Sequence, residues 1–432
     1  MRNSLLAICW GALGVIVSVH AASIAAPEPA SGWQAKSAVQ AQRFMAVTAH
    51  PLATQAAVDV LSNGGAAVDA AVAAQMVLNL VEPQSSGIGG GAFMLYWDAA
   101  ARQLHTLDGR ETAPAAADAN YFLDANGVRL KWREAMVGGR AVGVPGTLHL
   151  LHTAHSLFGK KPWAELFKPG ITLATEGFIV SPRLAQSIAS AADRGLLKFA
   201  PTREYFFTAS GEPLPVGSTL KNQLFANTLR QISQEGITPF YQGPIAQRLL
   251  KALENTSALP ALMTTEDLAR YRTILRSPVC APYRNYSVCG MGPPSSGALT
   301  VGQILGLVER FDLPRLGPSP QSIHLILEAS RLAFADRARY MADIDFVPVP
   351  VVGLLDSNYL SERSQMIHAD SSIGKASAGI PPGVLSANAT VYQSEPAGTS
   401  HLSIVDALGN IVSMTTTIES GFGSRLMTDG FL

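Results

Sequence analysis

Two alanine-rich segments near the N-terminus constrain the fold most strongly. They run from Thr54 to Leu61 and from Ala66 to Leu80, and Asn63-Gly64-Gly65 separates them. Asparagine followed by glycine is typical of a helix end, so the sequence predicts two consecutive helices. Small residues lie on most faces of both segments. We therefore expect these helices to pack closely against a sheet or against other helices.

Strand-like segments surround this helical pair, and the middle of the chain, from about Val144 to Ala269, is predicted to be mostly helical. The predicted strands lie at 43–49, 92–97, 104–107, 273–279 and 286–288. The predicted later helices lie at 147–158, 163–176, 222–235, 244–253, 299–309 and 322–341. Charged residues on the last helix, Glu328 and Asp336 among them, indicate a solvated or salt-bridged face.

The composition is that of a protein with a large core. Of the 432 residues, 47% are hydrophobic and 15% are charged, and 32 basic residues balance 32 acidic ones. Without a basic surplus, nucleic-acid binding has little support. The glycine run 85–91 lies between a helix and a strand, the reverse of a dinucleotide-binding fingerprint, so tight turns or close backbone approach explain it better. The nine histidines form no HExxH motif, and we expect neither a catalytic metal nor a cofactor.

The first residues resemble a signal peptide. Arg2 precedes an apolar run from Leu5 to Val19, and small residues follow, with cleavage predicted after Ala21 or Ala25. We therefore predict a signal peptide over residues 1–25, a periplasmic or secreted protein, and no membrane span after its removal. An uncleaved membrane anchor is the alternative.

Two cysteines remain after that removal. Cys280 and Cys289 flank a predicted turn, so they can face each other across two strand-like pieces. A disulfide is expected in an oxidising compartment, and two buried free thiols are the equal alternative.

A threonine near the C-terminus begins a strand that alternates between apolar and polar residues. Alone, Thr399 has an ordinary structural interpretation, because threonine is common in strands. If the chain is cut between Gly398 and Thr399, however, one residue carries both a hydroxyl nucleophile and an α-amine that can act as a base. The preceding polar segment, 365–398, is suited to cleavage.

The last residues are predicted to form a β-hairpin. Its strands cover 402–406 and 411–418, with a turn between them. If Asp406 faces Ile411, Thr417 falls beside Ser400 and one step from Thr399, so the two threonines are neighbours.

Several motifs, in this order along the chain, resemble the gamma-glutamyltransferase (gamma-glutamyltranspeptidase) family. The resemblance runs from about Arg43 to the last residue. It rests on His50-Pro51-Leu52-Ala53, Gly89-Gly90-Gly91-Ala92-Phe93-Met94, Asp108-Gly109-Arg110-Glu111-Thr112-Ala113-Pro114, Gly143-Val144-Pro145-Gly146, Pro162-Trp163, Gly177-Phe178, Pro293-Pro294-Ser295-Ser296-Gly297, Ala335-Asp336-Arg337 and Thr399-Ser400-His401.

The resemblance implies an α+β fold of the N-terminal-nucleophile hydrolase type, a four-layer αββα sandwich with a largely helical large-subunit portion. One precursor would cut itself into a large subunit, residues 26–398, and a small subunit beginning at 399, of which 399–432 are present. The two subunits would stay associated as a heterodimer. Thr399 would be the nucleophile, with Thr417 beside it. Arg110 would bind the substrate α-carboxylate, although an ion pair with Asp108 or Glu111 also explains an arginine here.

The same resemblance implies the substrates. The enzyme would cleave the gamma-glutamyl amide of glutathione or related compounds and pass the acyl group to water, an amino acid or a dipeptide. Two alternatives are a glutaryl- or cephalosporin-type amide acylase and an exported binding protein that never matures.

Two departures from the family pattern bear on these expectations. Glu419 stands where much of the family has an asparagine that helps hold the substrate α-ammonium. As a substrate-binding residue, Glu419 would either accept the same hydrogen bonds or favour another acyl group, which leaves substrate identity open. The family's oxyanion-hole glycines and further substrate contacts fall beyond Leu432. We therefore expect the natural protein to be longer and this chain alone to be inactive or poorly folded.

Overall fold

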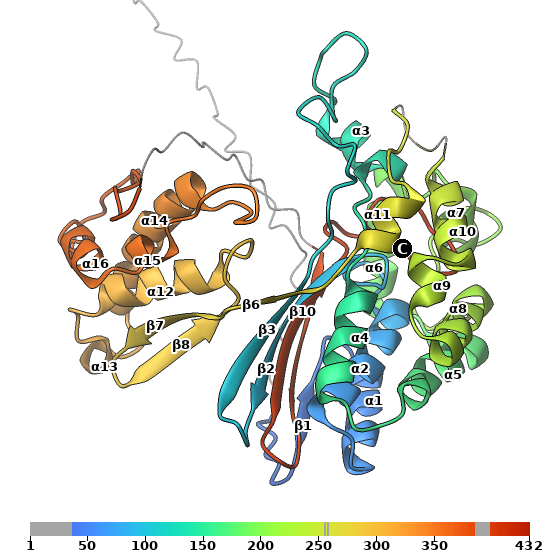
Figure 1. The fold of residues 1–432 in the computed structure, drawn as a ribbon, viewed down its shortest axis with the longest axis horizontal. Coiled ribbons are helices and arrows are strands. Elements are labelled where there is room, and N and C mark those ends of the chain that lie inside the picture. The colour runs from blue at the N-terminus through green and yellow to red at the C-terminus, as the bar shows by residue number, and fades with distance from the viewer. Residues whose placement is uncertain (1–36, 255, 257–258, 385–397) are drawn as a thin grey trace, which may run out of the picture.

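The computed structural model describes residues 37–254, 256, 259–384 and 398–432, which form two lobes (Figure 1). The described parts of 37–276 and 398–432 make up the first lobe, and 277–384 make up the second lobe. The signal peptide predicted over 1–25 lies outside the described residues, as does much of the polar segment expected to be cleaved.

A six-stranded antiparallel sheet forms the centre of the first lobe, with the strand order β1-β9-β10-β2-β3-β6. The strands are β1 (Met45–Val47), β2 (Gly91–Asp98), β3 (Gln103–Gly109), β6 (Ile274–Arg276), β9 (Thr399–Val405) and β10 (Ile411–Thr417). The C-terminal hairpin is therefore central, although its strands are the last in the sequence. This arrangement places Thr399 inside a sheet whose other strands, apart from β10, come from much earlier in the chain.

The predicted alanine-rich pair is confirmed as α1 (Pro51–Ser62) and α2 (Ala67–Val81). Every residue of α2 except Asn79 is buried, because its small side chains let it pack against α1, α4 (Thr147–Phe158), β9 and β10. The remaining helices of this lobe are α3 (Trp132–Met136), η1 (Gly139–Ala141), η2 (Trp163–Phe167), α5 (Lys168–Glu176), α6 (Pro182–Ala191), η3 (Ala192–Arg194), α7 (Ala200–Phe206), α8 (Gln223–Glu235), α9 (Thr238–Tyr241), α10 (Pro244–Leu253) and α11 (Thr265–Arg270). A short ribbon, β4 (Phe178–Ile179) with β5 (Thr219–Leu220), completes it. The helices cover one face of the sheet (Figure 1).

The second lobe has its own apolar clusters and is joined to the first through β6. Its elements are β7 (Val279–Tyr283), β8 (Tyr286–Gly290), α12 (Gly297–Val308), α13 (Leu313–Leu316), α14 (Pro320–Tyr340), α15 (Val351–Leu354) and α16 (Ser357–Ser364). Both core clusters draw on α12 and α14, which pack against each other.

Of the solvated or salt-bridged face that the sequence indicated on α14, the structure has the salt-bridged form, and its carboxylates are buried. Asp336 is 1% exposed and Glu328 is 2% exposed. Asp336 accepts hydrogen bonds from Gln303, Tyr359 and Arg363, and Glu328 pairs with Arg331. The expected salt bridges are present, but the carboxylates lie inside the lobe because buried partners compensate for their desolvation.

The register of the C-terminal hairpin differs by one residue from the expected one. Ile411 faces Val405 rather than Asp406, so Thr417 lies directly opposite Thr399. The turn begins one residue earlier because the Asp406 carboxylate accepts the backbone N–H groups of Leu408 and Asn410. The two threonines are consequently closer neighbours than predicted.

Cys280 and Cys289 form a disulfide in the structure, at facing positions of the β7–β8 hairpin. The bond closes a loop with a sequence separation of nine residues at the edge of the second lobe. The sequence left a disulfide and two buried free thiols as equal alternatives, and the structure contains the disulfide.

Reduction of this disulfide is expected to lower the free energy of unfolding of the second lobe by about 2 kcal/mol, because a short loop in the unfolded chain is no longer closed. Denaturant unfolding of the full-length protein with and without reductant measures the change. A Cys280→Ser/Cys289→Ser variant serves as the control, since its unfolding midpoint should be the same with and without reductant. An identical midpoint for the wild type in both conditions would contradict the expectation.

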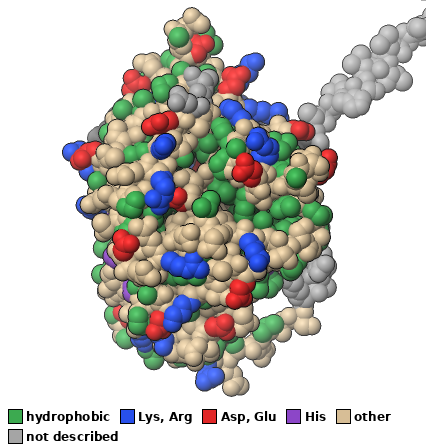
Figure 2. Space-filling view, turned by 90° about the vertical axis from the view of Figure 1, so that its right-hand side faces the viewer, with side chains coloured by type: hydrophobic (Ala, Val, Ile, Leu, Met, Phe, Trp, Pro, Cys, Tyr) green, Lys and Arg blue, Asp and Glu red, His purple; other side chains and the backbone are tan. Residues whose placement is uncertain are grey.

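Figure 2 shows a helical side of the first lobe, where basic and acidic side chains are interspersed. This pattern agrees with the balanced composition of 32 basic and 32 acidic residues. Within the described ranges, no helix combines the length and apolar character needed to cross a membrane.

Candidate active site

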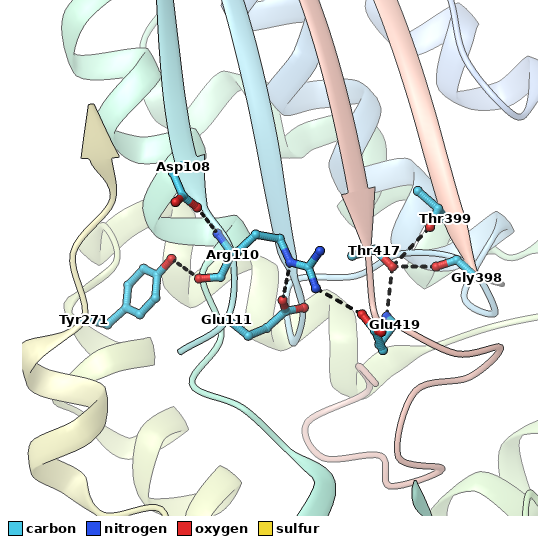
Figure 3. Close-up of polar contacts among 8 residues, drawn as sticks. All are labelled: Asp108, Arg110, Glu111, Tyr271, Gly398, Thr399, Thr417 and Glu419. Carbon is cyan, nitrogen blue, oxygen red and sulfur yellow. Dashed lines mark hydrogen bonds and ion pairs between the residues drawn. The ribbon is translucent and has the colours of Figure 1, made fainter. Parts of the chain in front are cut away.

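Thr399 and Thr417 meet at one end of the central hairpin (Figure 3). The Thr399 hydroxyl donates to Thr417 Oγ1 over 3.4 Å, and Thr417 Oγ1 donates to the Gly398 carbonyl oxygen over 2.6 Å. The backbone N–H of Glu419 donates to Thr417 Oγ1 over 2.9 Å. Thr417 therefore uses its one donor and both acceptor positions, which fixes its hydroxyl against the carbonyl before Thr399.

The alternation of β9 explains why Thr399 is accessible. Ser400, Leu402 and Ile404 are buried on the helix-covered face, and Thr399 lies on the opposite, exposed face. Since successive side chains of a strand point to opposite faces, the buried apolar residues determine the direction of the threonine hydroxyl.

Gly90 lets the glycine-rich loop approach the end of β10. A Cβ atom on Gly90 would lie 2.0 Å from the Thr417 carbonyl oxygen, so any side chain here would displace β10. The Gly90 carbonyl also accepts the N–H groups of Gly146 and Thr147. The prediction that these glycines serve close backbone approach is confirmed at this position.

Arg110 lies just after β3 and reaches toward the same end of the sheet. Its Nε donates to Glu111 over 2.8 Å, and an Nη donates to Glu419 over 3.0 Å. Burial opposes the charge of Arg110, but the Glu111 and Glu419 carboxylates outweigh burial and raise the pKa of the guanidinium. The structure thus contains the expected ion pair with Glu111. Glu419 links the guanidinium to the threonine pair, because its side chain pairs with Arg110 and its backbone N–H donates to Thr417.

Glu419 has an unusual backbone. Its φ is +71°, in the left-handed region that residues other than glycine rarely adopt. This conformation turns its N–H toward Thr417 while its side chain, 60% exposed, reaches Arg110. Backbone outliers of this kind cluster at functional sites.

A cavity of about 670 Å³ opens between the lobes at this site. Thr399, Arg110 and Glu419 line it from the first lobe, and Ser296 and Arg337 line it from the second. Ser296 accepts a hydrogen bond from Arg337 Nε over 2.8 Å. The Pro293-Pro294-Ser295-Ser296-Gly297 motif therefore contributes to the wall of this cavity.

Sequence reasoning missed Tyr271, whose hydroxyl donates to the Arg110 carbonyl oxygen over 2.7 Å. The two residues are 161 positions apart, and no local pattern marks the contact. Across the described residues, no group of three His, Cys, Asp or Glu side chains is arranged to hold a metal ion.

Gly398→Ala is expected to slow cleavage before Thr399 by about tenfold or more. A Cβ atom on Gly398 would lie 2.8 Å from the Ser420 carbonyl carbon and 2.9 Å from Gly421 N, so the scissile carbonyl must move away from Thr417. Gly421→Ala is a matched control, because its Cβ would meet nothing nearer than 4.0 Å. Band intensities on denaturing gels over time measure both rates, and equal rates for the two variants would refute the steric argument.

A threonine at the start of a central strand, with a second hydroxyl donating to the preceding carbonyl oxygen, fits the class of N-terminal-nucleophile hydrolases. The described residues supply one six-stranded sheet and one helical layer of that class. The chain belongs to the gamma-glutamyltranspeptidase family, whose sequence profile matches residues 53–432.

Individual relatives agree with this assignment. A glutathione hydrolase proenzyme from Bacillus subtilis (strain 168) is 37% identical over 394 residues, which cover 90% of this chain and 66% of the relative. An Acylase ACY 1 proenzyme from Pseudomonas sp. (strain V22) is 37% identical over 395 residues, 90% of this chain and 67% of the relative. The chain thus spans about two thirds of the length of these relatives.

Solved structures confirm the expected α+β fold. Helicobacter pylori gamma-glutamyltranspeptidase superposes with a TM-score of 0.76 at 35% identity, covering 81% of this chain and 99% of that one. Cephalosporin acylase from Bacillus halodurans superposes with a TM-score of 0.77 at 29% identity, covering 94% of this chain and 71% of that one.

Proposed function

We propose that the full-length protein is a self-cleaving gamma-glutamyl hydrolase and transferase that uses Thr399 as its nucleophile. The observation that carries this proposal is the contact of 2.6 Å between Thr417 Oγ1 and the Gly398 carbonyl oxygen, with the Thr399 hydroxyl 3.4 Å from the same Thr417 oxygen. A nucleophile and a hydrogen-bond donor thereby converge on one peptide group.

In the first step, Thr399 Oγ1 attacks the Gly398 carbonyl carbon and loses its proton. The oxygen that becomes negative accepts the hydrogen bond from Thr417, which stabilises it. The C–N bond then breaks, the Thr399 nitrogen takes up a proton, and Gly398 is left as an ester on Thr399. The α-amine of Thr399 is thereby free, and water then hydrolyses the ester, releasing the Gly398 carboxylate and the Thr399 hydroxyl.

In turnover, that α-amine removes the proton from Thr399 Oγ1, because its ordinary pKa of about 7.7–8.0 leaves part of it neutral near neutral pH. The hydroxyl attacks the gamma-amide carbon of glutathione or a related donor, and the amine side of the amide leaves with a proton. Arg110 binds the donor α-carboxylate. Water, an amino acid or a dipeptide then takes the gamma-glutamyl group from Thr399.

The maturation scheme extends to the subunits and to export. A large subunit ending at Gly398 and a small subunit beginning at Thr399 would stay associated, because β9 and β10 lie between β1 and β2 in one sheet. The signal peptide predicted over 1–25 supports a periplasmic or secreted location.

An amide acylase is the second candidate, and Glu419 is the observation that favours it. Its carboxylate already pairs with Arg110 over 3.0 Å, so the donor group that Arg110 accepts depends on how Glu419 moves. While Glu419 pairs with Arg110, it does not bind an α-ammonium, and glutaryl amides carry the carboxylate without that ammonium. The similarity to an acylase proenzyme also supports this candidate.

Two measurements on the full-length protein test these functions. A denaturing gel after incubation should show two polypeptides, and turnover of a gamma-glutamyl anilide should exceed that of a glutaryl amide. The reverse substrate preference would replace the proposal with the acylase. A single uncut polypeptide without turnover would overturn both and favour an exported binding protein that never matures.

A further inference from the structure

The main chain of Arg110 is held from both sides. Its N–H donates to Asp108 Oδ1 over 3.0 Å, and its carbonyl oxygen accepts from the Tyr271 hydroxyl over 2.7 Å (Figure 3). Asp108 is itself held, because Arg276 Nε donates to its other carboxylate oxygen over 2.7 Å. Two anchors therefore restrict the peptide groups from which the guanidinium extends.

Tyr271, which holds the Arg110 carbonyl, and Arg276, which holds the Asp108 carboxylate, belong to one short segment, residues 271–276, which we call the connector. It follows α11, includes β6 and leads from the first lobe to the second (Figure 1). Arg276 also donates to both carboxylate oxygens of Asp345 in the second lobe, over 3.0 Å and 2.6 Å. The connector thus contacts the Arg110 region and the second lobe through the same guanidinium.

The position of Tyr271 is tightly defined. Its ring stacks on Tyr241 at 5.9 Å between centroids and meets His149 edge-on at 5.6 Å. Burial lowers the pKa of His149 to about 4, so the imidazole is neutral and its Nδ1 accepts the Thr273 N–H over 3.2 Å. Burial also raises the pKa of Tyr271, which keeps its hydroxyl protonated as a donor.

Gly146 provides an independent observation. A Cβ atom at this position would lie 2.1 Å from the Tyr271 hydroxyl and 2.1 Å from the Gly109 carbonyl oxygen. The last glycine of the Gly143-Val144-Pro145-Gly146 motif therefore leaves the space that the Tyr271 hydroxyl needs to reach Arg110. Nothing about that motif alone indicated this purpose.

We propose that Tyr271 and Arg276 of the connector are positioning residues that orient Arg110 for the donor carboxylate and couple its orientation to the second lobe. The inference rests on the proposed function, because it assumes that Arg110 binds the donor. It adds two residues that line the same cavity as Thr399 and would act on the donor through Arg110. It also gives the second lobe a role in donor binding.

Tyr271→Phe is the first test. It removes the hydroxyl and keeps the ring stack, so KM for a gamma-glutamyl anilide should rise about three- to tenfold while kcat stays within about twofold. Cleavage before Thr399 should proceed at the wild-type rate, since the Thr417–Gly398 contact is untouched. Tyr340→Phe is the matched control, because that tyrosine also donates to a backbone carbonyl, Gly379 O at 2.6 Å, but lies in the second lobe. Its KM should stay at the wild-type value.

Asp345→Ala tests the coupling. It removes only the second-lobe contact of Arg276 and leaves the contact with Asp108, so KM should rise about two- to threefold with kcat unchanged. An unchanged KM in this variant would overturn the coupling to the second lobe.

The outcomes separate this inference from the proposed function. A wild-type protein that matures but does not turn over gamma-glutamyl donors would refute the function itself. A wild type that turns them over, with Tyr271→Phe at an unchanged KM, would refute the positioning role. Equal losses of kcat, cleavage rate and thermal stability in Tyr271→Phe would also refute it, because a general structural role predicts that pattern.

Discussion

Thr399→Ala is expected to leave the precursor as one polypeptide and to lower turnover by at least about 10³-fold. Alanine supplies neither the oxygen that attacks the Gly398 carbonyl nor the oxygen that would carry the acyl group. The Thr417 hydroxyl cannot substitute, because it is fully engaged with Gly398, Glu419 and Thr399. A denaturing gel and a chromogenic gamma-glutamyl assay on the full-length protein measure both losses.

Thr399→Ser is the matched control for this prediction. Serine keeps the hydroxyl and the α-amine, so the precursor should still be cut, at a reduced rate. N-terminal sequencing of the shorter polypeptide should then begin at residue 399 in both the wild type and the serine variant. A shorter polypeptide that begins elsewhere, or full processing of Thr399→Ala, would remove the basis of the proposed mechanism.

The sequence predicted the elements around the site better than their exact pairing. The alternation of residues 402–406 and 411–418 identified the hairpin, because the period of a strand is local information. The register differed by one residue, since it depends on how the Asp406 carboxylate organises the turn. That side-chain contact is not encoded in the alternation.

Contacts between distant segments explain most of what sequence reasoning missed. The sequence indicated a solvated or salt-bridged face on α14, and the salt bridges are present, but their burial was not predicted: Asp336 is 1% exposed because Arg363 and Tyr359 reach it from α16. Tyr271 meets Arg110 only after α11 and β3 have been placed against each other. The periodicity of one segment does not show which side chains of a distant segment will contact it.

Arg110→Met should lower kcat/KM for a gamma-glutamyl anilide by about 10²- to 10³-fold and leave cleavage before Thr399 unchanged. Methionine keeps much of the aliphatic volume but cannot form the paired N–H contacts that a carboxylate accepts. Removing one partner of a desolvated charge pair costs about 2–5 kcal/mol, and each 1.4 kcal/mol corresponds to a factor of ten.

The site explains why maturation and turnover should respond differently to this substitution. Arg110 contacts Glu111 and Glu419, whereas the scissile carbonyl contacts only Thr417 among the side-chain hydrogen bonds of the described residues. Arg315→Met is a suitable control, since this arginine pairs with Asp312 on the exposed surface of the second lobe. If Arg110→Met matures normally and retains wild-type kcat/KM, another group binds the donor carboxylate. If it fails to mature, Arg110 supports the precursor fold rather than the substrate.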